Sequence, residues 1–161
     1  MGAGAHTRRR GQGFLYARAV ADVAIEALQR VPLLSKLDKK ELKSMSREMS
    51  ERTFPPGAEV TATGKSGVGF FIIDAGTATV RVGDRVVASL KAGDHFGEMA
   101  LIDGGARSAD IVADTELRCF CMTAWNFRPF VRAHPDLAWA LLETLVARLR
   151  EAQSPAAAPA A

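Results

Sequence analysis

The chain has few of the residues that form disulfides or bind metals. Its 161 residues include only two cysteines and three histidines. Cys119 and Cys121 are two positions apart on an expected strand, so their side chains point the same way and lie too close for an unstrained disulfide. The histidines are distant from one another in the sequence, which is not the spacing of a zinc site. We expect both cysteines to be small buried core residues, and neither a metal nor a cofactor to be bound.

Long apolar runs are also missing. No uninterrupted apolar stretch reaches the ~18 residues that span a bilayer. Thr7–Arg10 followed by Phe14 loosely resembles a twin-arginine export signal, but Arg18, Asp22 and Glu26 interrupt the apolar region that such a signal requires. The sequence therefore predicts a cytoplasmic protein without membrane insertion.

The predicted folded region carries no excess of positive charge. The whole chain has a net charge of +3 and a pI of about 9.1, but Arg8, Arg9 and Arg10 near the N-terminus account for both. Without these three, the 21 basic residues fall to 18, against 18 acidic ones. Nucleic acid is therefore not an expected partner. A content of 48% hydrophobic and 24% charged residues is typical of one globular domain.

Helical patterns occur before residue 50. Residues 1–13 and 154–161 lack a pattern that could bury a face, so both are predicted to be disordered tails. Apolar spacing from Phe14 to Val31 predicts a helix that Pro32 ends or bends. A capping box at 38–41 begins a second helix, with Leu42, Met45 and Met49 as its inward stripe.

The central region predicts short antiparallel strands, and helices return after it. Tight turns separate six β-like segments, a pattern typical of a barrel or double-sheet roll. The segments are Glu59–Ala62, Gly69–Ile73, Thr77–Val82, Val86–Leu90, Asp110–Ala113 and Leu117–Met122. Helices are predicted after Thr123 and after Pro135, with a kink or break at Pro129. One domain over 14–153 would thus contain helices 14–50, a β-roll over 54–122 and helices 123–152.

Catalytic and DNA-binding motifs are not supported. Gly64-Lys65-Ser66 resembles the end of a P-loop, but the first glycine of that motif would fall on Glu59, and a strand rather than a helix follows. No Ser/His/Asp or Cys/His arrangement suggests a nucleophile with its base. Too few residues follow Gln153 for a helix-turn-helix. We expect a binding protein, not an enzyme.

The segment 96–109, FGEMALIDGGARSA, is the candidate binding site. A helical turn over Met99–Ile102 directly after Gly97 would present free backbone N–H groups that favour an anion. Arg107 could hold two phosphate oxygens at once. Glu98 would repel a phosphate, so its expected partner is a hydroxyl donor such as a ribose 2′-OH.

Two glycines connect the acidic and basic parts of this segment. Gly104 and Gly105 would let the chain reverse and bring Arg107 back towards the helical turn. These parts describe a pocket for a small sugar phosphate. From the residues alone, a surface ion pair between Glu98 and Arg107 remains the commoner alternative.

The same segment resembles a known family. Gly93–Leu101, GDHFGEMAL, followed by Arg107–Ala109 is similar to the phosphate-binding cassette of cyclic nucleotide-binding domains, such as those of bacterial cyclic-nucleotide-gated potassium channels and the catabolite activator protein. Phe70–Ile73 and Pro55–Gly57 resemble the family's central strand and the entry to its β-roll. The resemblance covers roughly 20–152. It implies an α+β fold in which helices flank an antiparallel eight-stranded β-roll.

The resemblance also implies roles for individual residues, with the cassette at 96–109. Gly97 would permit close approach of the ligand, Glu98 would accept the ribose 2′-OH and Met99 would line the pocket wall. Arg107 would pair with the cyclic phosphate.

The remaining implied contacts complete the ligand site. Backbone amides near Ala100 and Ser108, with the Ser108 hydroxyl, would cradle the phosphate. Arg148 would cover the base, unless it is an arginine on a solvated helix face.

The implied function is that of a sensor. The chain would bind cAMP in preference to cGMP, a preference that Ser108 favours over the threonine of some cGMP binders. Movement of residues 124–152 would relay binding to an unidentified effector protein. We expect a stand-alone module, either an independent protein or a fragment of a larger one. The alternative is a ligand-free domain of the same fold that acts as a protein interaction module.

Overall fold

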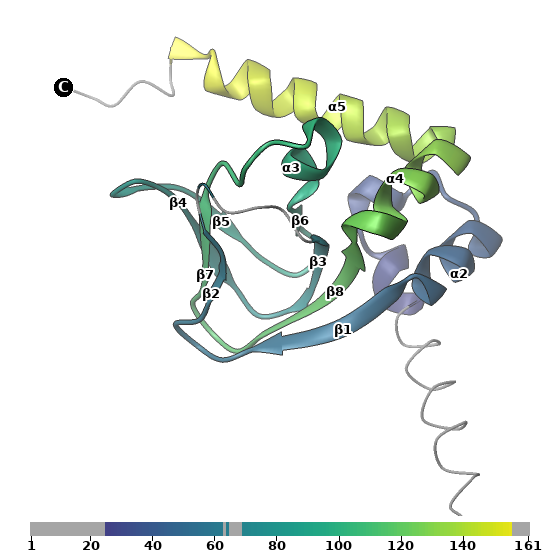
Figure 1. Cartoon of the computed structure of the whole chain (residues 1–161), viewed down its shortest axis with the longest axis horizontal. Helices are drawn as coiled ribbons and strands as arrows, with labels where there is room; N and C mark the ends of the chain where they lie inside the picture. The colour runs from purple at the N-terminus through teal and green to yellow at the C-terminus, as the bar shows by residue number, and fades with distance from the viewer. Residues whose placement is uncertain (1–24, 63, 65–68, 156–161) are drawn as a thin grey trace, which may run out of the picture.

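A computed structural model describes residues 25–62, 64 and 69–155 of the chain. Helical residues 25–29 lead into a short 3-10 helix, and a β-roll followed by two helices completes the described part (Figure 1). The elements in chain order are η1 (Pro32–Leu34), α2 (Lys39–Arg47), β1 (Met49–Phe54), β2 (Glu59–Thr61), β3 (Gly69–Ala75), β4 (Ala78–Val82), β5 (Arg85–Leu90), β6 (His95–Phe96), α3 (Glu98–Asp103), β7 (Asp110–Ala113), β8 (Leu117–Thr123), α4 (Ala124–Ala133) and α5 (Pro135–Ala152).

The roll consists of two antiparallel sheets of four strands each. One sheet has the order β1-β8-β3-β6 and the other β2-β7-β4-β5. These eight strands with flanking helices confirm the predicted fold class. The six strands predicted from residue patterns are all present, with ends that differ by up to two residues.

Two of the eight strands were not predicted from residue patterns. The helices before the roll end at Arg47, so the predicted helical range 14–50 was wrong at its end, and Met49 begins β1 instead of continuing a helix. Residues 50–53 of β1 are all exposed, so this strand shows no alternation of buried and exposed positions. Its register with β8, from Met49 opposite Met122 to Phe54 opposite Leu117, holds it in the sheet. β6 has two residues, too few for a pattern.

Successive side chains of β8 point to opposite sides of its sheet and belong to two different hydrophobic clusters. Cys119 and Cys121 face the interior of the roll with Phe71 and Phe96, while Phe120 and Met122 face the helices. Both cysteines are buried and free, as predicted. Burial raises the pKa of the Cys119 thiol to about 12, which keeps it protonated and unreactive near neutral pH.

The helices before the roll agree with their sequence signals where the structure describes them. Of the helix predicted from Phe14, residues 14–24 lie outside the described residues, while residues 25–29 are helical and Pro32 begins η1. The predicted capping box is present, because the Asp38 carboxylate accepts from the Glu41 backbone N–H and the Glu41 carboxylate accepts from the Asp38 N–H, both at 2.8 Å.

The helices after the roll follow its last strand directly. The Thr123 hydroxyl caps α4 by accepting from the backbone N–H of Asn126. α4 continues through Pro129, so of the kink or break predicted there the break was wrong, and the kink stays a prediction. Proline removes the bond to the carbonyl four residues earlier, that of Trp125, and this residue is 88% exposed, so water can replace the lost donor.

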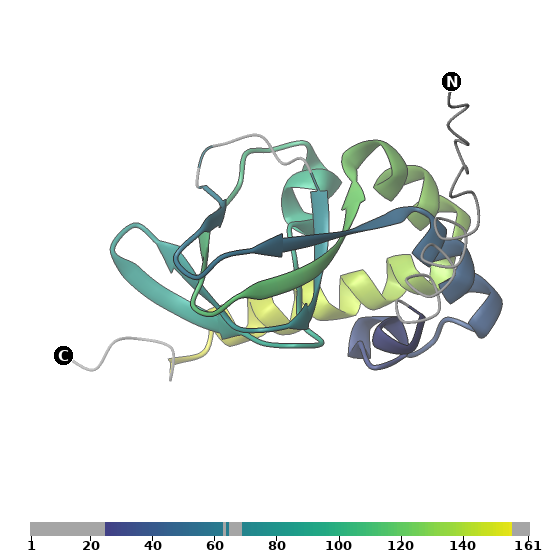
Figure 2. The same ribbon diagram turned by 90° about the horizontal axis from the view of Figure 1, so that it is seen from below.

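α5 lies across one end of the roll. Figures 1 and 2 show it running past α3 and α4, with its C-terminal half above the roll opening next to α3. Its N-terminal half packs on η1 and α4. None of the helices in the described ranges combines the length and the apolar character needed to cross a membrane.

Candidate binding site

A cavity of about 390 Å³ lies between the roll, α3 and the C-terminal half of α5. Residues from β2, β4, β5, β6, α3, β7 and α5 contribute to its wall, together with the loop that follows α3. The structure brings every sequence-predicted site residue to this one cavity: Gly97, Glu98, Met99, Ala100, Arg107, Ser108 and Arg148.

Gly97 is the N-cap of α3 and allows close contact between three chain segments. Its φ of 95° lies in the left-handed region that favours glycine. A Cβ at this position would come within 2.5 Å of both Arg107 Nη1 and the Gly69 carbonyl oxygen. Any side chain here would therefore displace Arg107 from the cavity wall.

Glu98 is a buried carboxylate at the first turn of α3, with only 1% of the residue exposed. Its Oε1 forms an ion pair with the Arg148 guanidinium. Its Oε2 is buried and has no hydrogen-bond partner in the structure. A buried carboxylate oxygen without a donor is costly, so this atom is suited to accept a hydrogen bond from a ligand in the cavity.

Arg107 lies at the other side of the cassette and is 7% exposed. Nη1 donates to the Gly97 carbonyl at 3.0 Å and Nη2 donates to the Gly69 carbonyl at 2.8 Å. Burial lowers the pKa of Arg107, but a guanidinium stays protonated near neutral pH. Its other N–H groups have no assigned partner among the described residues and can bind an anion in the cavity.

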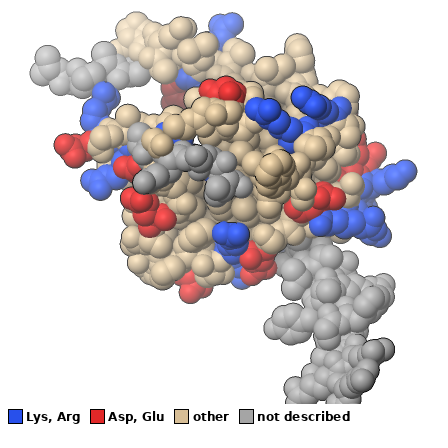
Figure 3. All heavy atoms as spheres, viewed as in Figure 1, with Lys and Arg blue, Asp and Glu red and all other residues tan. Residues whose placement is uncertain are grey.

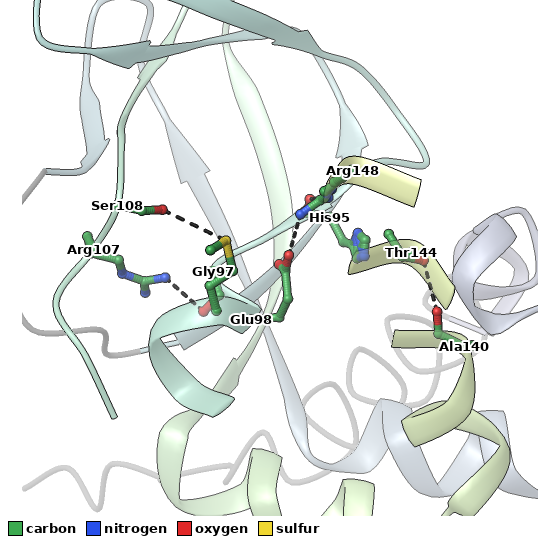
Figure 4. A network of polar contacts seen from close by, with 9 residues as sticks. His95, Gly97, Glu98, Arg107, Ser108, Ala140, Thr144 and Arg148 are labelled. Atoms are coloured by element: carbon green, nitrogen blue, oxygen red, sulfur yellow. Dashed lines mark hydrogen bonds and ion pairs between the residues drawn. The ribbon is translucent and has the colours of Figure 1, made fainter. Parts of the chain in front are cut away.

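Glu98 and Arg107 therefore do not form the surface ion pair that the residues alone left open. Each has its own partner, and Figure 4 shows Arg107 on one side of Gly97, with Glu98 and Arg148 on the other. The acidic and basic ends of the cassette thus face different parts of one cavity.

Met99, Ala100 and Ser108 line the wall between these two ends. Ala100 is buried, whereas Met99 is 49% exposed and Ser108 is exposed. The Ser108 hydroxyl lies 3.9 Å from the Met99 sulfur. A weak sulfur acceptor leaves this hydroxyl free to bind a better one.

Arg148 projects from α5 towards the cassette. Besides its ion pair with Glu98, its Nη2 lies 3.5 Å from the His95 carbonyl oxygen. The contact with a base that the family resemblance implies therefore stays a prediction, and the structure places this guanidinium at the Glu98 end of the cavity (Figure 4).

The sequence reading missed the apolar wall opposite the cassette. Val80 and Val82 alternate along β4, and Val87 and Ala88 lie on β5, where a register shift in the β4–β5 pairing leaves Val87 as the extra residue. The alternation of valines in β4 was a usable signal. The bulge could not be predicted from the sequence, because it depends on how two strands pair.

His95 was also missed. It is 7% exposed, its ring meets Phe70 edge-on at 5.7 Å, and its Nε2 has no hydrogen-bond partner in the structure. Burial is the main cause that lowers its pKa, and the nearby Arg148 charge lowers it further, against the opposing effects of Glu98 and Asp94. His95 is therefore neutral in the folded protein near pH 7.

Comparison with known proteins points to one family. The family model of the cyclic nucleotide-binding domain matches residues 51–134. A cyclic nucleotide-gated potassium channel of Rhizobium etli is 36% identical over 118 residues, which is 73% of this chain and 33% of the channel. The chain thus spans about a third of that relative's length.

Solved structures show the same fold. A regulatory subunit of a cAMP-independent protein kinase A from Trypanosoma brucei aligns with a TM-score of 0.71 and 27% identity, over 86% of this chain and 48% of that one. The catabolite activator protein of Thermus thermophilus aligns with a TM-score of 0.70 and 29% identity, over 76% and 60%. In the described residues of this chain, no three His, Cys, Asp or Glu side chains are grouped as metal ligands.

Proposed function

Because the chain belongs to the cyclic nucleotide-binding domain family, we propose that its cavity binds a cyclic nucleotide, cAMP in preference to cGMP. The observation that carries the proposal is the unpartnered Glu98 Oε2, a buried acceptor on the wall of the cavity that also holds Arg107. The ligand then has to offer a hydroxyl at one end and an anion at the other. A ribose cyclic phosphate offers both.

Arg107 matches the charge of such a ligand. A cyclic phosphodiester carries one negative charge near neutral pH, and one buried guanidinium balances it. The two carbonyl contacts hold the guanidinium in place before the ligand arrives, so little side-chain entropy is lost on binding. The Ser108 hydroxyl and the amides near Ala100 complete the phosphate contacts in this proposal.

Glu98 can serve the ribose without releasing Arg148. Oε1 stays with the guanidinium while Oε2 accepts the 2′-OH, so one carboxylate joins the ligand to α5. The neutral His95 beside this pair places no second positive charge there. Arg148 thereby acts on the ligand through Glu98, and its contact with the base becomes an additional role.

The relay to an effector would begin at this connection. α5 carries Arg148, and α4 carries Arg128, whose Nε donates to the Leu101 carbonyl at 2.9 Å near the end of α3. A shift of the cassette on binding would therefore reach both C-terminal helices. By this proposal the chain is a regulatory module whose output is the position of residues 124–152.

Isothermal titration calorimetry with three ligands tests the proposal. We expect cAMP to bind more tightly than cGMP, and 2′-deoxy-cAMP to bind more weakly than cAMP because it lacks the donor for Glu98 Oε2. Thermal unfolding gives a second readout, since a ligand that binds only the folded state raises Tm. No heat and no Tm shift with millimolar cAMP would refute nucleotide binding.

The second candidate is a ligand-free interaction module. It is suggested by a protein with this fold, the regulatory subunit of a cAMP-independent protein kinase A from Trypanosoma brucei. The same titrations separate the two, because a ligand-free module responds to none of the three nucleotides. Glu98 and Arg107, the two side chains proposed to bind the ligand, are both present on the cavity wall, and this supports the binding function.

A further inference from the structure

Two buried side-chain atoms in the described residues have no hydrogen-bond partner, and they belong to residues of the same site. One is Glu98 Oε2, the proposed acceptor for the ribose hydroxyl, and the other is His95 Nε2. Both residues line the ligand cavity. Arg148 also contacts both, because its Nη1 pairs with Glu98 Oε1 and its Nη2 lies 3.5 Å from the His95 carbonyl oxygen. The His95 ring is therefore placed to act on the carboxylate that would hold the ribose.

His95 begins β6 and lies between two cavities. One is the ligand cavity, and the other, of about 420 Å³, is lined by residues of η1, β5, the turn before β6, and α5. In Figure 4 the His95 ring lies on the side of Glu98 away from Arg107, towards Thr144 of α5. Solvent in the second cavity can therefore approach this residue from the side away from the proposed phosphate position.

The charge state of the ring determines what its Nε2 can do. A neutral imidazole has one donor and one acceptor nitrogen, whereas a protonated ring donates from both. Burial lowers the pKa of His95, so the ring is neutral near pH 7, and Glu98 is the charge that most favours the protonated form. Once protonated, the ring is a cationic donor near a carboxylate oxygen that has no donor of its own.

The other groups that face His95 do not offer such an oxygen. The Arg148 charge opposes protonation of the ring, and the Asp94 carboxylate favours it but accepts from a backbone N–H of its own turn. Glu151 lines both cavities from α5 and is exposed to solvent. β3 packs apolar side chains against the ring, and the parts of η1 and β5 at the second cavity are uncharged. Glu98 is therefore the carboxylate whose buried oxygen can take the proton of His95 as a hydrogen bond.

We propose that His95 makes ribose binding depend on pH, because its protonated ring competes with the ribose 2′-OH for Glu98 Oε2. This role rests on the proposed function of the cavity and makes His95 a positioning residue for the ribose-binding carboxylate. When the ring is neutral, the oxygen is free for the ribose. When the ring is protonated, it donates to the oxygen, and cAMP has to displace that bond. Binding of cAMP then releases a proton, and by linkage the proton weakens binding of cAMP.

A comparison of two nucleotides isolates this competition. A positive charge on His95 also attracts the anionic phosphate, but it does so equally for cAMP and 2′-deoxy-cAMP, and only cAMP uses Oε2. On the face of the molecule in Figure 3, Lys and Arg side chains are interspersed with Asp and Glu side chains, and such groups do not change charge near pH 6 when exposed. The ratio of the Kd of 2′-deoxy-cAMP to the Kd of cAMP therefore reports on the oxygen alone.

Isothermal titration calorimetry of the whole chain with both nucleotides, from about pH 7.5 to about pH 5, tests the competition. The ratio should fall at least about threefold on acidification, since each pH unit below the pKa of His95 can cost cAMP up to about tenfold in affinity. His95→Gln should remove the fall, because an amide does not titrate, and so should His95→Phe, which keeps a ring against Phe70. His134→Gln is the matched control, because His134 stacks on Phe130 and lines neither cavity, and it should keep the fall.

NMR titration of the ligand-free protein gives a readout that needs no nucleotide. Glu98→Gln should lower the pKa of His95 further, because it removes the charge that favours the protonated ring. Asp103→Asn, at the end of α3 and outside both cavities, should leave it unchanged. Circular dichroism checks that each variant keeps the wild-type fold.

Three results would overturn the role of His95. They are a ratio that does not change with pH in the wild type, a fall that persists in both His95 variants, and a His95 pKa that is the same in Glu98→Gln as in the wild type. If neither nucleotide bound at any pH, the proposed function would fail, and the NMR titration would still test the contact between His95 and Glu98.

Discussion

Replacement of Arg107 is the perturbation with the largest expected effect on ligand binding. The residue is 7% exposed, and its guanidinium is held by two backbone carbonyls while it faces the cavity. Arg107→Ala removes the positive charge that balances the phosphate and leaves the Gly97 and Gly69 carbonyls without their donor. The substitution should therefore change both affinity and stability.

The size of each effect follows from the number of bonds lost. A hydrogen bond to a charged group contributes about 1.5–3 kcal/mol, so losing even one phosphate bond weakens cAMP binding at least about tenfold, and losing two weakens it about 100-fold or more. The two carbonyl bonds are lost from the ligand-free protein as well. An unsatisfied buried group costs about 1–3 kcal/mol, so Arg107→Ala should also lower the free energy of unfolding.

Calorimetry and thermal unfolding separate these two effects. Titrations run well below the Tm of the variant report affinity of the folded protein alone. Arg118→Ala is the matched control, because Arg118 pairs with Asp74 on the outside of the roll and does not line the cavity. An Arg107→Ala protein that is folded and binds cAMP as tightly as the wild type would refute the role of this guanidinium.

Three further predictions concern the cassette and its neighbours. Glu98→Gln should weaken cAMP binding less than Arg107→Ala does and should reduce the difference between cAMP and 2′-deoxy-cAMP, as measured by calorimetry; an unchanged difference would contradict the ribose contact. Arg128→Ala should speed amide hydrogen exchange at the end of α3, because it removes the donor to the Leu101 and Ile102 carbonyls, while the exposed Arg132→Ala should not. His95 has a pKa below 6.5 in the folded state, so its contribution to stability is present above pH 6.5 and is lost as pH falls through the folded-state pKa, by up to about 1.4 kcal/mol per pH unit. Denaturant unfolding should show this loss in the wild type and a shallower one in His95→Leu.

The cassette was predictable from sequence because its geometry is local. Gly97, Glu98 and Arg107 lie within eleven consecutive residues, and a glycine before one helical turn is enough to place them. The fold class was predictable for a related reason, since most strands combine apolar patterns with clear turns. In both cases, neighbouring residues determine the structure.

The features of the fold and the site that were not predicted depend on contacts between distant segments of the chain. β1 is a strand because β8 offers it a partner along six residues, although its own sequence is mostly exposed and polar. The position of Arg148 against Glu98 depends on how α5 crosses the roll, because the two residues are fifty positions apart in the chain. The apolar wall likewise needs the β4–β5 bulge. Apart from the alternating valines of β4, none of these features has a local signal in the chain.

α5 carries Arg148, which forms an ion pair with the carboxylate that we propose holds the ribose. If the ligand changes the position of α5, this ion pair transmits the change. The factor by which cAMP then changes the affinity of the chain for an effector bound to α5 must equal the factor by which the effector changes the affinity for cAMP. If Glu98 binds Arg148 and the ribose together without moving α5, both factors are one, and the ion pair transmits nothing.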